Sequence, residues 1–266
     1  MVVLFDGVPS VPRGPLLESG LPSVTPAEVG LGLDARSSPG PGDPAALARF
    51  FAEATRRPAI ARATGGWVVA GPEGKVVPGD DAVALCLAAA SRPVPRRVAV
   101  FGGAWIAEDE EEYGDIMELG RALAERDTHL LCGGYQGAMA AACRGVSDGG
   151  GVAVGITISA WNDQVAVNPW VTHQLVARDL FARLPVITDA DAWVAFSGGV
   201  GTLQEVALCW NLVQTGLAEP RPLVLVGERW DRQVRLLREV LLVSDPRHFD
   251  LVRTATTAQE ALGALS

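Results

Sequence analysis

From Arg96 onward the chain alternates short apolar runs of strand length with segments of helix length. We expect strands at 98–101, 129–132, 152–156, 193–196 and 223–226, with a last one near Leu251. We expect helices at 112–125, 136–146, 171–187, 203–215 and 231–242, and from about 257. This alternation predicts an α/β fold, a doubly wound parallel sheet with helices on both faces. Ligands bind such sheets beyond the carboxyl ends of the strands, where the strand order reverses.

The first 95 residues do not follow this pattern. Residues 1–43 are rich in Pro, Gly and Ser and predict mostly loop. A helix is expected over 44–57, beginning at Pro44 after an Asp43 cap. A hairpin over 66–77, a helix over 80–91 and a linker at 91–95 follow. We therefore expect a small α+β N-terminal region over 1–95 and a main ligand-binding domain over 96–266.

Composition excludes several classes of protein. The net charge of −9 argues against general nucleic-acid binding, which uses Lys and Arg to neutralise phosphates. No run is long and apolar enough to span a membrane, and the N-terminus lacks the regions of a secretory signal. The cysteines lack zinc-like spacing and are expected to be mostly buried free thiols: Cys86, Cys132, Cys143 and Cys209. We expect a cytoplasmic protein without a metal or cofactor.

All 22 basic residues except Lys75 are arginines. No residue after position 75 can form a lysine Schiff base or serve as the lysine of a P-loop. Pyridoxal-phosphate chemistry and Walker-type NTP hydrolysis are therefore set aside for the C-terminal part. An anion site there must use arginine and backbone amides.

Three glycine clusters directly follow the first, second and fourth expected strands. They are Gly102-Gly103, then Gly133-Gly134 with Gly137, and Gly198-Gly199 with Gly201. Glycine lets backbone N–H groups approach a ligand closely, and a helix N-terminus favours an anion. Because the first and fourth strands can be neighbours where the strand order reverses, we expect these loops to share one crevice that binds a nucleotide-like phosphate ligand. No cluster has the dinucleotide fingerprint, which disfavours NAD.

The segment from Ser197 to Glu205 links the fourth strand to a helix. Two interpretations of Thr202 and Glu205 stay open. In the first, Thr202 caps the helix and Glu205 folds back to its N-terminus, as in a capping box. In the second, Glu205 is a catalytic carboxylate beside the phosphate. The two roles are compatible.

Other polar residues carry weaker signals. Arg183 is a candidate to bind the anion, although an arginine on a helix is commonly a solvated surface residue. Arg178 is an alternative candidate. His173 is interpreted as structural or exposed rather than as an acid or base. The run Glu108–Glu112 is interpreted as a solvated loop and first helical turn rather than as a metal site.

Four segments, in their order along the chain, resemble the LOG ("lonely guy") family, whose members are often labelled lysine decarboxylases: Val98–Gly103, Leu131–Met139, Asp179–Arg183 and Ser197–Glu205. The resemblance covers about residues 96–266. It implies a Rossmann-like fold and a homodimer. It also implies hydrolysis of the N-glycosidic bond of nucleoside 5′-monophosphates, notably cytokinin riboside monophosphates, with release of the base and ribose 5-phosphate.

The family signature PGGxGTxxE identifies the residues that the resemblance implicates. It matches Gly198, Gly199, Gly201, Thr202 and Glu205, whereas Ser197 replaces the proline. Of an upstream Arg-Lys pair, Arg183 matches and Leu184 replaces the lysine. The resemblance implies catalytic roles for Glu205 and Arg183, and phosphate binding by the glycine loops and Thr202.

The segment 168–172 is similar to a branch related to molybdenum-cofactor carrier proteins, which bind without hydrolysis. A non-catalytic carrier of a nucleotide-like or molybdenum-cofactor-type ligand is therefore the alternative function. A regulatory or partner-binding role of residues 1–95 has no supporting motif. Loops at 104–113 and 157–172 are expected to select the base, with Trp105 and Trp161 as rings that stack on it.

Overall fold

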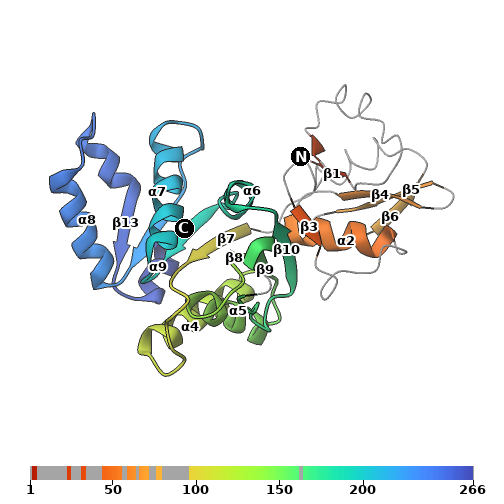
Figure 1. The fold of residues 1–266 in the computed structure, drawn as a ribbon, viewed down its shortest axis with the longest axis horizontal. Helices are drawn as coiled ribbons and strands as arrows, with labels where there is room; N and C mark the ends of the chain where they lie inside the picture. The colour runs from red at the N-terminus through yellow and green to blue at the C-terminus, as the bar shows by residue number, and fades with distance from the viewer. Residues whose placement is uncertain are drawn as a thin grey trace. The chain divides into compact units, whose positions relative to one another are not determined.

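The computed structural model describes residues 2–4, 23–24, 31–33, 44–55, 59–63, 66–71, 76–79, 96–161 and 164–265 (Figure 1). The chain divides into two compact units. The first comprises 1–95 with 158–160 and 173–183, and the second comprises 96–157, 161–172 and 184–266. Among the described residues, no helix is long and apolar enough to cross a membrane.

Six parallel strands form the sheet of the second unit. They are β7 (Arg96–Phe101), β8 (Thr128–Cys132), β9 (Ala153–Ile158), β11 (Ala192–Ala195), β12 (Leu223–Val226) and β13 (Val252–Ala255). Their order is β13-β12-β11-β7-β8-β9, and each neighbouring pair is parallel. The strand order therefore reverses between β7 and β11, the first and fourth strands of the sequence prediction. A reversal at this point places the ligand crevice beyond the carboxyl ends of these two strands.

Helices cover both faces of this sheet. They are α4 (Glu111–Glu125), α5 (Ala138–Asp148), α7 (Val200–Gln214), α8 (Glu228–Val240) and α9 (Ala258–Ala264). Val98, Leu130 and Val194 point into the core formed with α4, α5 and α9. Side chains alternate along a strand, so the next residues point to the other face, where Leu225 meets α7 and α8. The prediction of an α/β fold with helices on both faces is confirmed.

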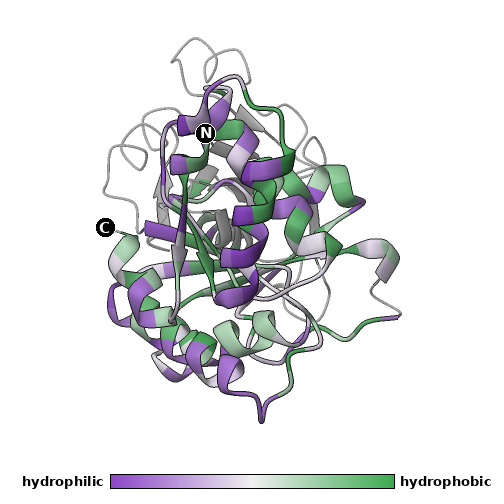
Figure 2. Cartoon of the chain, turned by 90° about the vertical axis from the view of Figure 1, so that its left-hand side faces the viewer, coloured by the Kyte–Doolittle hydropathy of each residue, from purple (hydrophilic) through white to green (hydrophobic). Residues whose placement is uncertain are grey.

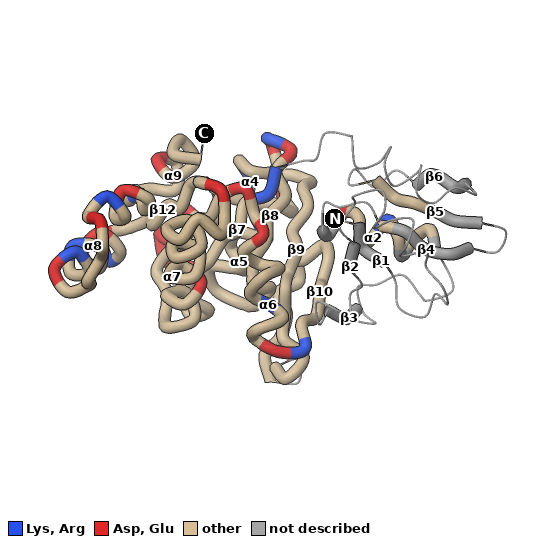
Figure 3. Tube along the Cα trace, turned by 90° about the horizontal axis from the view of Figure 1, so that it is seen from above, with Lys and Arg blue, Asp and Glu red and all other residues tan. Residues whose placement is uncertain are grey.

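The distribution of polarity follows from this layering. Figure 2 shows hydrophilic residues interrupting hydrophobic ones along the helices, as expected for helices with one buried side. Charged residues gather on α8, where basic and acidic side chains are interspersed (Figure 3). This helix therefore does not present the continuous basic surface of a nucleic-acid-binding protein.

The first unit contains a second, smaller sheet. Its strands are β1 (Val2–Leu4), β2 (Ser23–Val24), β4 (Ala59–Ala63), β5 (Gly66–Ala70) and β6 (Val76–Gly79), in the order β2-β1-β4-β5-β6. Helix α2 (Pro44–Thr55) packs on β4 and β5. In the same unit β3 (Leu31–Leu33) pairs antiparallel with β10 (His173–Ala177). Helix α6 (Leu180–Ile187) begins in this unit and ends in the second.

The N-terminal predictions have mixed outcomes. The helix that begins at Pro44 and the hairpin of β5 and β6 are confirmed. The described parts of 1–43 are short strands rather than loop. The helix at 80–91 and the linker at 91–95 lie outside the described residues. A separate N-terminal domain over 1–95 stays a prediction.

The helix predicted over 171–187 is wrong in its first half. Residues 173–177 form strand β10, and α6 begins only at Leu180. Asp179 explains the late start, because its Oδ1 accepts a hydrogen bond from the Ala182 N–H at 2.8 Å. This bond also contributes to the lowered pKa of the Asp179 carboxyl. A side chain that bonds in this way caps a helix and marks its first turn.

Candidate phosphate-binding site

The backbones of the three glycine loops meet at Gly103. Its N–H donates to the Ser197 carbonyl at 2.8 Å, which joins the loop after β7 to the loop after β11. Its carbonyl accepts from the Ala138 N–H at 2.9 Å, which joins it to the loop after β8. The expectation that these loops come together is thus confirmed for their backbones. Ligand binding by them stays a prediction.

Several of these glycines are required by packing. A Cβ at Gly102 would lie 2.4 Å from the Ala138 Cβ, and one at Gly137 would lie 2.2 Å from the Gly103 carbonyl oxygen. Gly134 and Gly137 also have φ angles of +78° and +64°, which side chains other than glycine rarely adopt. At Gly198 a Cβ would overlap Thr202 Oγ1 at 2.2 Å, because the threonine side chain folds back beneath it. Gly133 is buried beside them.

Gly199 and Gly201 differ from this group. Both are exposed, and neither has a φ in the left-handed region. Among the described residues, a Cβ at Gly199 would meet only Trp105 at 3.8 Å, and a Cβ at Gly201 would meet nothing within 4 Å. Glycine costs a helix about 0.5–1 kcal/mol relative to alanine. This cost applies to Gly201, which lies inside α7, whereas Gly199 is the N-cap of α7, a position that favours glycine. The described fold therefore gives no reason for Gly201, and the bare backbone at both positions would let a ligand approach closely.

Helix α7 begins between these two glycines, with Gly199 as its N-cap. Its first backbone bond runs from the Leu203 N–H to the Gly199 carbonyl at 3.0 Å. The N–H groups of 200–202 therefore have no acceptor within the helix. Together with the helix dipole they provide donors for an anion.

The capping-box interpretation of Thr202 and Glu205 is wrong. Thr202 is the third residue of α7 rather than its cap, and its exposed fraction is 4%. Glu205 lies one turn later on the same buried side, with an exposed fraction of 7%. Burial raises the pKa of the Cys209 thiol, and the negative charge of Glu205 raises it further. A buried carboxylate is thus placed one helical turn behind the open backbone amides.

Two residues to which the sequence analysis assigned no role in holding the site connect the loops. Asn168 is buried, and its Nδ2 donates to the Tyr135 carbonyl at 2.8 Å while its backbone N–H donates to the Gly134 carbonyl at 2.9 Å. The Trp230 indole Nε1 donates to the Phe196 carbonyl at 2.9 Å. Contacts between residues more than 30 positions apart leave no local signal in the sequence.

The two predicted stacking rings both lie in loops of the second unit. Trp105 has an exposed fraction of 85% and lies against Gly199. Trp161 is 40% exposed, and its ring centroid lies 5.9 Å from that of Tyr135. Trp105 is therefore the ring placed beside the α7 N-terminus.

Three polar residues that the sequence suggested as site candidates belong to the first unit, and they differ in burial and in their partners. Arg178 is exposed, and its Nε donates to Asp179 Oδ2 at 2.9 Å, which makes it a surface residue. His173 Nε2 lies 2.9 Å from Glu53 Oε2 and its ring packs on Phe50, so its structural interpretation is confirmed. Arg183 is buried in α6. A role for Arg183 beside Glu205 stays a prediction.

The acidic run begins α4 as expected. Glu111 and Glu112 lie in its first turn, and Glu110 Oε1 accepts from the Ala107 N–H at 2.8 Å. Within the described ranges, no group of three His, Cys, Asp or Glu side chains could hold a metal ion. Cys132, Cys143 and Cys209 are buried and form no disulfide, as predicted, whereas Cys86 lies outside the described residues.

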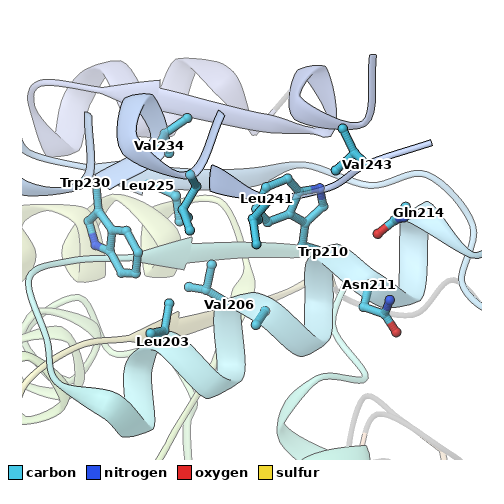
Figure 4. A pocket seen from close by; sticks show the side chains of 12 residues that line it. Leu203, Val206, Trp210, Asn211, Gln214, Leu225, Trp230, Val234, Leu241 and Val243 are labelled. Atoms are coloured by element: carbon cyan, nitrogen blue, oxygen red, sulfur yellow. The ribbon is translucent and has the colours of Figure 1, made fainter. Parts of the chain in front are cut away.

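An apolar cavity of about 430 Å³ lies between α7 and α8 (Figure 4). Leu203, Val206 and Trp210 line it from α7, and Trp230 and Leu241 lie opposite. Its polar lining includes the side-chain amides of Asn211 and Gln214, and none of its described lining residues is a carboxylate or an arginine. It is therefore not the expected phosphate site.

Residues 95–221 match the SLOG cluster4 family. A cytokinin riboside 5′-monophosphate phosphoribohydrolase from Rhodococcoides fascians is 32% identical over 151 residues, which cover 54% of this chain and 74% of that protein. The chain is a divergent member of the LOG family. A probable cytokinin riboside 5′-monophosphate phosphoribohydrolase from Oryza sativa subsp. japonica is 28% identical over 192 residues, which cover 69% of this LOG protein and 85% of the rice protein.

A solved structure shares the fold of this LOG protein. It is the molybdenum cofactor binding protein from Rippkaea orientalis, with a TM-score of 0.51 and 22% sequence identity. The match covers 64% of this chain and 94% of that protein. The Rossmann-like fold implied by the resemblance is confirmed.

Substitution of Gly137 tests the packing of the loops, and Gly216 provides a matched control. Both residues have a positive φ, +64° and +72°, but no described atom lies within 4 Å of a Cβ at Gly216. Gly216→Ala should lower the free energy of unfolding by about 1–2 kcal/mol through its backbone angle alone. Gly137→Ala should cost about 1–3 kcal/mol more, because its methyl group overlaps the Gly103 carbonyl. Chemical denaturation of both variants measures the difference, and equal losses would contradict this packing.

Proposed function

We propose that this LOG protein is a nucleoside 5′-monophosphate phosphoribohydrolase, which releases the base and ribose 5-phosphate. The observation that carries the proposal is the pair of exposed, unobstructed glycines, Gly199 and Gly201, directly before the buried Glu205. The names of the relatives from Rhodococcoides fascians and rice support the same activity. The proposed protein is a cytoplasmic homodimer that needs no metal or cofactor.

The 5′-phosphate would bind at the N-terminus of α7. The N–H groups of 200–202 point beyond the helix, and the glycines beside them let phosphate oxygens approach the backbone. Arg183 would add a positive charge to the phosphate or polarise the departing base. The exposed indole of Trp105, beside Gly199, would stack on the base.

Glu205 would act at the sugar. Hydrolysis breaks the bond from C1′ to the base nitrogen, whose electron pair leaves with the base, and a water oxygen bonds to C1′. The sugar passes through an oxocarbenium-like transition state, which a nearby carboxylate stabilises. The same carboxylate can orient the water and accept its proton, which then passes to the nitrogen of the departing base, so that one water is consumed and Glu205 is regenerated.

A carrier protein that binds a phosphorylated ligand without turnover is the second candidate. Leu184 follows Arg183 where the LOG signature has lysine, which removes one cationic group from the site. The open amides of α7 would serve such a ligand equally well. Ligand stabilisation without base release would distinguish this function from the first.

Base release from AMP and isopentenyladenosine monophosphate tests the first candidate. Wild type should release the free base, and Glu205→Ala should lose about 10²–10⁴ of the rate, as is typical when an acid–base group is removed. Gln204→Ala is the control, because Gln204 is the exposed neighbour on the same turn. Chromatography measures the products. A Glu205→Ala variant with the wild-type rate would remove Glu205 from the mechanism.

Substitution of Gly201 separates ligand binding from folding. Gly201→Ala should raise stability by about 0.5–1 kcal/mol, since alanine favours the helix and the site is open. It should raise the KM for AMP at least about tenfold, because the methyl group occupies the phosphate position. Gly263→Ala in α9 is the matched control, an exposed helical glycine that is equally unobstructed. Equal KM values for the two variants would contradict a phosphate at this turn.

A further inference from the structure

We propose that Glu112 is a positioning residue for the loop from Ser197 to Gly201, and that it acts by accepting a hydrogen bond from the backbone N–H of Ser197. The Ser197 N–H donates to Glu112 Oε1 at 2.8 Å, across 85 positions of sequence. Both residues are half-buried, so water competes weakly for the bond. The consequence for a ligand rests on the proposed function, whereas the hydrogen bond itself is a feature of the fold.

The bond completes a set of backbone contacts at the end of β11. The Phe196 N–H donates to the Phe101 carbonyl at 2.9 Å, and the Phe196 carbonyl accepts from the Trp230 indole at 2.9 Å. The Ser197 carbonyl accepts from the Gly103 N–H at 2.8 Å. With Glu112, every backbone donor and acceptor of these two residues has a partner. The exposed segment from Gly198 to Gly201 begins directly after them.

Glu112 provides the charged partner of this set. A hydrogen bond to a carboxylate is shorter and about twice as strong as one between neutral groups. Its position in the first turn of α4 places a negative side chain at the positive end of the helix dipole, which stabilises the helix. The carboxylate would repel a phosphate rather than bind it. Its contribution to binding is therefore to fix the peptide that precedes the open amides.

The pair depends on the identity of residue 197. A proline has no N–H and a φ fixed near −65°, so the bond to Glu112 exists because the chain has serine here. Serine at this position leaves the backbone freer to rotate than proline does. The hydrogen bond to Glu112 restricts the backbone rotation of Ser197, as the pyrrolidine ring of a proline would.

Three variants test the role through affinity for ribose 5-phosphate, measured by calorimetry. Glu112→Ala should weaken binding about 10–150-fold, the range expected when a hydrogen bond to a charged group is lost. Glu112→Gln should stay within about threefold of wild type, because its amide oxygen can accept the same bond. Glu111→Ala is the control, since Glu111 is an exposed glutamate in the same turn. An affinity of Glu112→Ala equal to that of wild type would overturn the proposal.

Ser197→Pro provides a second, independent test. Proline has no backbone N–H, so the Ser197→Pro variant lacks the donor of the bond to Glu112. Adding Glu112→Ala to this variant should change the affinity for ribose 5-phosphate by less than about twofold, so the effects of the two substitutions are not additive. Full additivity would show that Glu112 acts through another group and would overturn the proposal. Amide hydrogen exchange at Ser197 should accelerate in Glu112→Ala but not in Glu112→Gln. Unchanged exchange in the alanine variant would also contradict the proposal.

These outcomes separate the two proposals. A wild-type protein that binds neither AMP nor ribose 5-phosphate contradicts the proposed function and, with it, the role of Glu112 in positioning. A wild type that binds ribose 5-phosphate, together with a Glu112→Ala variant that binds it equally well, contradicts the role of Glu112 alone.

Discussion

The contact of three loop backbones at Gly103 is the constraint on which the site depends. The N–H of Gly103 donates to the loop after β11, and the carbonyl of Gly103 accepts from the loop after β8. No side chain fits between these backbones, since a Cβ at Gly137 would lie 2.2 Å from the Gly103 oxygen. The contact fixes where α5 and α7 begin. The positions of the open amides and of Glu205 therefore follow from contacts between the backbones of the three loops.

The glycines of this site fall into two groups, those at which the fold excludes a Cβ atom and those at which it does not. Gly102, Gly134 and Gly137 are needed because neighbouring atoms or backbone angles exclude a Cβ. Gly199 and Gly201 have neither restriction; Gly199 is the N-cap of α7, where glycine is favoured, but Gly201 lies inside the helix, where glycine is unfavourable. The proposed approach of a phosphate to the backbone would account for the glycine at 201. The same distinction explains why a glycine-rich signature contains both structural and binding positions.

The sequence predicted what depends on periodicity and failed where distant contacts decide. Strand β12 has the predicted bounds, 223–226, because buried parallel strands are continuous apolar runs. The helix expected over 171–187 contains a strand, since pairing with β3 and the Asp179 cap override the local pattern. The capping box failed because α7 starts at Val200, three residues before the predicted helix. Glu112 was correctly placed in the first turn of a helix, but its bond to Ser197 joins that helix to the loop after β11 across 85 positions and has no local signature.

The most direct test of this account is to locate the phosphate. Amide NMR spectra of the protein, titrated with ribose 5-phosphate, report which backbone N–H groups gain an acceptor. The account predicts that the largest shifts fall on residues 199–202, with smaller ones at Gly103 and Ser197. Saturable shifts that instead cluster on Val206, Trp210 and Val234 would place the ligand in the apolar cavity. That result would contradict a phosphate site at the N-terminus of α7.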